Sequence, residues 1–181
     1  MQGFSKFIFS RVLGWKLIGN FPSDLKKYVV IAAPHTSWKD FPIAILARNV
    51  SGEKINFIGK DSLFKGPFGF FFRSLGGTPV DRSKSNNLVD AIVQIFDSRE
   101  EFRLGLSPEG TRKKIDPWKT GFYFIAKGAN VPIVMATLDF ENKQVKVSDP
   151  YDLTEDKEKD FEHIYSFYRG VKGKHPEQFN L

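Results

Sequence analysis

The chain alternates short apolar runs with segments in which apolar residues recur every three or four positions. Short apolar runs between turn residues are typical of buried strands, and the longer spacing is typical of amphipathic helices. The runs predict strands at 28–33, 55–59, 78–80, 104–106 and 131–138, with a return strand at 145–147. The spacing predicts helices up to about residue 49 after the first strand, and at 67–75, 88–96, 121–127 and 154–170. This order predicts an α/β fold, with a mixed, mainly parallel sheet flanked by helices in a single domain spanning residues 1–181.

The N-terminal 20 residues allow two interpretations. Between residues 4 and 18, apolar side chains recur at near-helical spacing and three basic residues are interspersed. One interpretation is an interfacial helix that inserts aromatic rings into a membrane surface and places its basic residues against anionic lipid. The other is a short helix followed by an edge strand at 15–19, both packed on the domain.

A second apolar stripe follows the Gly66-Pro67 break. It consists of Phe68, Phe71, Phe72 and Leu75, which share one face of a helix. We expect this face to pack in the core, and a ligand groove is the alternative.

Composition narrows the classes of protein that the chain can represent. It has 27 basic and 21 acidic residues, a formal net charge of +6, which favours anionic partners. The absence of cysteine excludes disulfides, thiolate catalysis and cysteine-ligated metal. No stretch approaches the roughly 20 apolar residues of a membrane span, and the N-terminus does not read as a signal peptide. We therefore expect a cytoplasmic protein that meets membrane only at its surface.

The strongest candidate for chemistry is His35, which directly follows the predicted strand at 28–33. Ligands collect at the carboxyl ends of strands in α/β proteins. Thr36 and Ser37 can cap a helix whose first turn holds Asp40. Since residues five apart on a helix do not share a face, His35 must lie in the preceding turn and fold back on Asp40. The carboxylate would then fix the imidazole tautomer and leave the other ring nitrogen free to accept a proton.

A second polar loop follows the predicted strand at 104–106. It reads Ser107-Pro108-Glu109-Gly110-Thr111-Arg112. Glycine permits close approach of the backbone to a ligand, and arginine offers a planar fork for phosphate. Lys60 and Arg82 also lie at or just beyond strand ends, and such ends converge where strands run parallel.

Four blocks occur in an order that resembles one family. They are His35-x4-Asp40, Gly76-Gly77-Thr78-Pro79-Val80-Asp81-Arg82, Pro108-Glu109-Gly110-Thr111-Arg112 and Val131-Pro132-Ile133-Val134. The chain resembles the lysophospholipid acyltransferases, the glycerolipid acyltransferase family that includes 1-acylglycerol-3-phosphate acyltransferase. The resemblance implies a fold like that of glycerol-3-phosphate acyltransferase. It also implies transfer of a fatty acyl group from acyl-CoA or acyl carrier protein, as co-substrate, to the hydroxyl of a lysophospholipid, with no metal and no cofactor.

The resemblance also assigns roles to residues. His35 would be the general base and Asp40 would orient it. The acceptor phosphate would be held by Arg82 and by the loop of Glu109, Gly110, Thr111 and Arg112. Glu109 would also interact with hydroxyl groups of the acceptor. Lys60 matches a basic position that helps to bind phosphate in relatives.

Each of these residues has an alternative role. Arg82 could pair with Asp81, Glu109 could brace its own loop, Lys60 could be a solvated lysine, and Arg112 could meet lipid head groups. The chain could likewise acylate an amino-acid lipid or another hydroxylated lipid, or could be a non-catalytic lipid- or anion-binding module. No sequence motif supports nucleic-acid binding. Acyl chain length, the choice of donor and oligomeric state are left open by the sequence.

Overall fold

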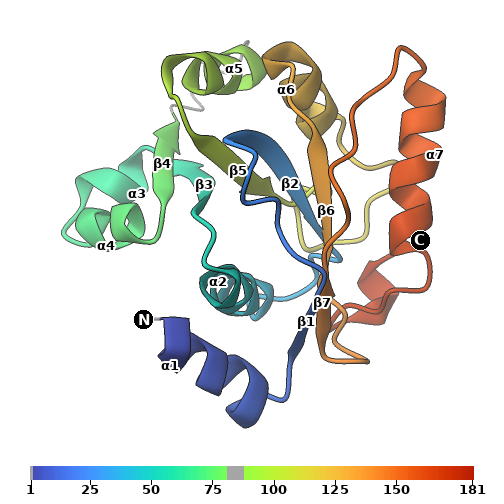
Figure 1. Cartoon of the computed structure of the whole chain (residues 1–181). Coiled ribbons are helices and arrows are strands. Elements are labelled where there is room, and N and C mark those ends of the chain that lie inside the picture. Colours follow the sequence, from blue (N-terminus) through green and yellow to red (C-terminus); the bar gives the residue numbers. More distant parts are fainter. Residues whose placement is uncertain (1, 81–87) are drawn as a thin grey trace.

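A computed structural model of the chain describes residues 2–80 and 88–181 (Figure 1). Its centre is a five-stranded sheet in the order β4-β3-β5-β2-β6. The strands are β2 (Lys27–Ala33), β3 (Ile55–Lys60), β4 (Gly77–Val80), β5 (Phe102–Leu106) and β6 (Ile133–Thr137). All neighbouring strands pair in parallel, and isolated antiparallel bridges add the return segment after β6. The predicted α/β fold with a mainly parallel sheet is confirmed.

Helices cover both faces of this sheet. On one face lie α5 (Leu88–Ser98), α6 (Gly121–Ala129) and α7 (Lys157–Tyr168), and on the other lies α2 (Asp40–Ser51). The alternation of side chains along β2 explains this arrangement. Val29 and Ile31 join the apolar cluster formed with α5, α6 and α7, whereas Tyr28 and Val30 join the cluster formed with α2. A strand buried on both faces must be largely apolar, and β2 carries no charged residue after Lys27.

The parallel register brings the carboxyl ends of the strands to one edge of the sheet. Ile31 of β2 pairs with Leu106 of β5, and Lys60 of β3 pairs with Val80 of β4. The His35 turn follows β2, and the Ser107–Arg112 loop follows β5, the strand next to it. Because β2 and β5 are neighbours, these two polar loops emerge side by side.

The N-terminal segment folds as the second of the two interpretations, a short helix followed by an edge strand. It forms α1 (Gln2–Lys6), a π-helical segment η1 (Phe7–Val12) and β1 (Lys16–Ile18), which pairs with β7 (Gln144–Lys146) in a small second sheet. Phe9 and Trp15 are buried against the α2 side of the protein. The helix followed by an edge strand is therefore present, and Phe4, Phe7 and Val12 nevertheless remain exposed.

The predicted helix at 67–75 is shorter and more exposed than expected. Residues 67–75 form α4 (Gly69–Ser74), and a separate short helix, α3 (Ser62–Lys65), precedes the Gly66-Pro67 break. Phe72 is half-buried and packs on Phe64, with ring centroids 6.2 Å apart. Phe68 and Phe71 are exposed, so the expectation that the whole stripe packs in the core is wrong.

The last helix begins later than predicted because a different residue caps it. Asp156, not Thr154, is the N-cap, and its side chain accepts the N–H of Lys159. The N–H and hydroxyl of Thr154 instead donate to Asp160, which is fully buried. The hydroxyls of Tyr123 and Tyr151 also donate to this carboxylate. Burial alone would raise the pKa of Asp160, but these hydrogen bonds lower it overall, and they fix α7 on the sheet.

Candidate active site

His35 and Asp40 are in direct contact. Nδ1 of His35 lies 3.0 Å from Oδ2 of Asp40. His35 follows the cis peptide bond between Ala33 and Pro34, whereas Asp40 is the first residue of α2. The predicted fold-back of the histidine onto the aspartate is confirmed.

Asp40 is held by the backbone of its own turn. Its Oδ2 also accepts the N–H groups of Thr36 and Ser37, each at 2.8 Å, and only 1% of the residue is exposed. The carboxylate of Asp40 therefore closes the turn. Of the two predicted capping residues, Ser37 accepts the N–H of Lys39 with its hydroxyl oxygen at 3.3 Å, whereas the hydroxyl oxygen of Thr36 accepts the N–H of His175. This arrangement fixes the carboxylate before any ligand binds.

The hydrogen-bonding pattern determines which imidazole nitrogen is free. A carboxylate only accepts hydrogen bonds, so Nδ1 of His35 carries the hydrogen and Nε2 has the free lone pair. Within residues 2–80 and 88–181, no hydrogen bond engages Nε2. The His35 side chain is 26% exposed, while that of Asp40 is 2% exposed. The ring can therefore meet an incoming molecule on the side away from the carboxylate.

Glu109 braces the His35 turn from the neighbouring loop. Both of its carboxylate oxygens accept the backbone N–H of His35, at 3.0 and 2.9 Å, and Oε2 also accepts the Ser107 hydroxyl at 3.0 Å. Glu109 is only 3% exposed. Burial raises its pKa, and the hydrogen bonds from His35 and Ser107 oppose that rise. These contacts favour the loop-bracing alternative for Glu109 over contact with acceptor hydroxyls.

The rest of the second loop presents cations at the surface. Gly110 has φ +62°, and its N–H donates to the carbonyl of Ser107, which makes a tight turn. Arg112 is exposed, and Thr111 is half-buried. The side chain of Lys119 lies over Gly110, where a Cβ would come within 3.0 Å of it. Lys119 is not one of the predicted residues, and its one signal in the sequence is the presence of three lysines among residues 113–120.

Two predicted cations are placed only in part. The backbone of Lys60 ends β3 at the same edge of the sheet as His35, but its side chain is outside the described part of the protein. Arg82 lies between residues 80 and 88, outside the described residues. Their predicted roles remain predictions.

The C-terminal segment also contacts the His35 turn, which the sequence did not indicate. The backbone N–H of His175 donates to Oγ1 of Thr36 at 3.1 Å. Gly173 packs so closely on this turn that a Cβ there would lie 2.6 Å from the same oxygen and 2.9 Å from Pro34. Phe179 packs against Trp118, at a centroid distance of 6.1 Å. The turn is thus supported by Glu109 on one side and by the chain terminus on another.

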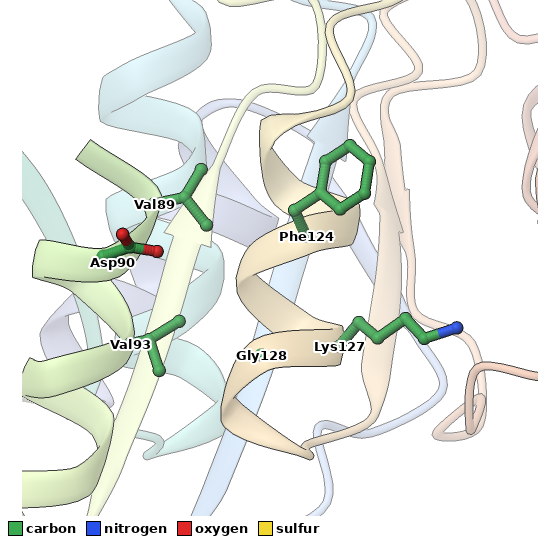
Figure 2. Close-up of a pocket in the computed structure, with 6 residues that line it drawn as sticks. All are labelled: Val89, Asp90, Val93, Phe124, Lys127 and Gly128. Atoms are coloured by element: carbon green, nitrogen blue, oxygen red, sulfur yellow. The ribbon is translucent and has the colours of Figure 1, made fainter. Parts of the chain in front are cut away.

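One hollow of the surface lies apart from the predicted site residues. A hollow of 640 Å³ lies between α5 and α6 (Figure 2). Its lining is Val89, Asp90, Val93, Phe124, Lys127 and Gly128, and none of these is a predicted site residue. Across the described ranges, no group of three or more His, Cys, Asp or Glu side chains could hold a metal ion.

The family to which the chain belongs defines its class, that of the acyltransferases. The family described as Acyltransferase matches residues 16–138, which contain all eight predicted site residues. The chain belongs to this family, and the predicted resemblance is confirmed.

Named relatives make the likeness more specific. The chain is 27% identical over 146 residues to the 1-acyl-sn-glycerol-3-phosphate acyltransferases of Salmonella typhimurium and Salmonella typhi. These alignments cover 76% of this chain and 58% of each relative, so the chain spans less than two thirds of their length. Its fold resembles the crystal structure of the 1-acyl-sn-glycerophosphate (LPA) acyltransferase PlsC from Thermotoga maritima, with a TM-score of 0.67 and 20% identity over 94% of this chain and 76% of that one.

Proposed function

We propose that this chain transfers a fatty acyl group from the thioester of coenzyme A or acyl carrier protein to the free hydroxyl of a lysophospholipid such as 1-acylglycerol-3-phosphate. The observation that carries the proposal is the 3.0 Å contact between His35 and Asp40, made by an aspartate that the backbone already fixes. Family membership and the named relatives support the reaction class.

The proposed chemistry needs one base and good positioning. Nε2 of His35 takes the proton of the acceptor hydroxyl while that oxygen attacks the thioester carbonyl carbon. The carbon–sulfur bond then breaks, and the departing thiolate takes the proton back from the imidazolium. Asp40 stabilises the imidazolium while it carries that proton. A thioester is already activated, so general-base catalysis and orientation can suffice.

Cations near His35 would hold the phosphate of the acceptor. Arg112 and Lys119 lie on the loop beside the His35 turn. Lys60 is the last residue of β3, which ends at the same edge, and Arg82 is two residues beyond the end of β4 in the sequence. A phosphate held by such groups would anchor the acceptor and orient its hydroxyl. Among these four cations, we assign phosphate binding to Arg82 and Arg112, because a guanidinium group can bind a phosphate with two hydrogen bonds.

A lipid acceptor places the reaction at a membrane surface, on the cytoplasmic face if the chain is cytoplasmic as expected. None of the helices in residues 2–80 and 88–181 is long and apolar enough to cross a bilayer. The N-terminal segment supports peripheral contact, because Phe4 and Phe7 are exposed beside Lys6 and Arg11. Aromatic rings with flanking cations are suited to an interface that contains anionic lipid.

The activity is tested with a panel of acceptors and both types of donor. The full chain is incubated with phosphorylated lysolipids, neutral monoacylglycerols and amino-acid lysolipids, with acyl-CoA or acyl carrier protein, and products are read by mass spectrometry. We expect acylation of phosphorylated lysolipids and release of the free thiol. Transfer only to a non-phosphorylated lipid would show that the acceptor is not a phosphorylated lysolipid. Binding without any transfer would identify a non-catalytic module.

Arg82→Ala and Arg112→Ala test the phosphate assignment. We expect each to raise the KM for phosphorylated acceptors by about tenfold or more, the loss typical of one charge-assisted hydrogen bond. The KM for the donor and the turnover of neutral acceptors should change little. Arg169→Ala is the matched control, since Arg169 is exposed at the end of α7 and pairs with Glu162. Equal losses with phosphorylated and neutral acceptors would refute the phosphate role.

A further inference from the structure

Three neighbouring phenylalanines of the α3–α4 segment point to solvent. The exposed fractions are 69% for Phe68, 75% for Phe70 and 49% for Phe71. We call these three rings the α4 aromatic face. Single exposed apolar residues are common, but several large rings gathered on one short segment are typical of an interaction site.

The outward direction of these rings is built into the packing of the segment. Gly69 is buried, and a Cβ at that position would collide with the main chain of Phe64. Phe72, on the inner side, packs on Phe64. Since Gly69 and Phe72 make the inward contacts, the neighbouring rings at 68, 70 and 71 are left on the outside. The exposure therefore follows from close packing on the inner side rather than from a loose segment.

The α4 aromatic face is connected through α2 to the His35 turn and to the exposed N-terminal rings. Arg48 of α2 donates to the carbonyl of Leu75, just after α4, at 2.6 Å. Gln2 of α1 donates to the carbonyl of Val50, near the end of α2, at 3.1 Å. In Figure 1, α2 lies between α1 and the α3–α4 segment. At its other end α2 begins at Asp40, and Trp38, two residues earlier, is 65% exposed.

The charges around these rings favour an anionic partner. Lys65 and Arg73 are exposed and close in sequence to the α4 aromatic face. Lys39 is exposed next to Trp38 and lies over its ring. The acidic residue of the α3–α4 segment, Asp61, pairs with Lys65. Residues 2–23 carry three basic residues and no acidic residue. An occupant that is broad, apolar inside and anionic at its surface fits this combination.

We infer that the α4 aromatic face inserts into the surface of a bilayer that contains anionic lipid, as a docking site additional to the N-terminal segment. Insertion of Phe68, Phe70 and Phe71 would hold the α3–α4 segment at the membrane surface and, through the contact of Arg48 with Leu75, the C-terminal end of α2 beside it. The use of this docking for catalysis rests on the proposed function, whereas the docking itself does not.

The experiment uses the full chain with vesicles of phosphatidylglycerol and phosphatidylcholine. In flotation, a Phe68→Ser/Phe70→Ser/Phe71→Ser variant should lose at least about tenfold in vesicle partitioning, because apolar burial drives insertion. Phe124→Ser is the matched control: Phe124 is also exposed, but on α6 at the other face of the sheet, and we expect it to float like the wild type. Thermal unfolding of each variant checks the fold, and Phe70→Ser alone should give a smaller loss in the same direction.

Tryptophan fluorescence measures insertion directly. Trp15 and Trp118 are buried, so quenching by lipids brominated on their acyl chains reports chiefly on Trp38. A second variant, Phe70→Trp in a Trp38→Phe background, places the probe on the α4 aromatic face. We expect strong quenching of this introduced indole. Wild-type flotation by the triple serine variant, or no quenching of the introduced indole, would overturn the inference. Self-association in sedimentation that the serine changes abolish, without vesicle binding, would assign the face to a second copy of the chain instead.

Acyl-transfer assays separate this inference from the proposed function. With short-chain donors and acceptors below their micelle concentrations, the triple serine variant should keep the wild-type kcat/KM. With acceptors embedded in vesicles, its rate should fall with its binding. An absence of transfer by the wild type would refute the proposed function and leave the vesicle-binding result standing. Equal rates of both proteins on vesicles would refute the catalytic use of the α4 aromatic face.

Discussion

Replacing His35 with alanine is expected to lower kcat for acyl transfer by at least about 100-fold, the lower end of what a general base contributes. The ring is 26% exposed and meets Asp40 only through Nδ1, so its removal should leave the backbone contacts with Glu109 in place. The KM for acceptor and the unfolding temperature should therefore change little. Steady-state kinetics with 1-acylglycerol-3-phosphate and an acyl thioester measure both constants.

His163→Ala is the matched control for this change. His163 is exposed on α7, where it stacks on Tyr151 with ring centroids 4.0 Å apart, far along the chain from the site. It should retain full activity. Wild-type turnover by the His35 variant would contradict the assigned mechanism, and equal losses in both variants would point to a general loss of structure.

Asp40→Asn is expected to have the second largest effect, a fall in kcat on the order of 10²-fold. The same exchange costs about 10⁴-fold in the Ser-His-Asp triad, where it imposes the wrong tautomer. Here the N–H groups of Thr36 and Ser37 would hold the amide oxygen in the place of Oδ2, so the tautomer of His35 should persist. The loss would then come from the missing negative charge beside the imidazolium.

The same kinetic measurement with Asp97→Asn provides the control, since Asp97 is exposed on α5. The Asp40 variant should lose kcat rather than acceptor affinity. It should also lose about 1 kcal/mol of stability, because the N–H groups of Thr36 and Ser37 would donate to a neutral amide oxygen instead of a carboxylate. A fall in acceptor affinity with unchanged kcat would show that Asp40 shapes the binding site and does not act on His35.

Much of the fold and the central pair could be predicted because their signals are local. The strand before His35 is an unbroken apolar run, and the five-residue spacing to Asp40 forces the histidine into the turn. The contact of Glu109 with the backbone of His35 could not be predicted, because it depends on β5 lying next to β2. Strand order is a property of the tertiary fold, and the residues in contact are 74 positions apart.

The misassigned elements show where pattern and packing separate. Periodicity indicates which residues of α4 share a face, but whether another element covers that face depends on the rest of the fold.

The N-cap of α7 was predicted at the wrong residue for a local reason. Thr154 and Asp156 are both good capping residues, and Thr154 donates its hydrogen bonds to the buried Asp160 instead. The contact of Gly173 with Thr36 could not be predicted from the sequence, because glycine occurs near the end of a chain for many structural reasons other than close packing.

The most direct test of the general-base role replaces the accepting oxygen of the substrate with sulfur. The thiol of cysteine has a pKa of about 8.5, well below that of an alcohol. The pKa of the thiol acceptor is measured first, and the assay is run at a pH above it, where most of this acceptor is already thiolate and needs no base. On the hydroxyl acceptor, the His35→Ala variant should be slower than the wild type by at least about 100-fold. On the thiol analogue at the same pH, this difference should shrink to a few-fold. A defect of equal size on both acceptors would contradict the claim that His35 removes the acceptor proton.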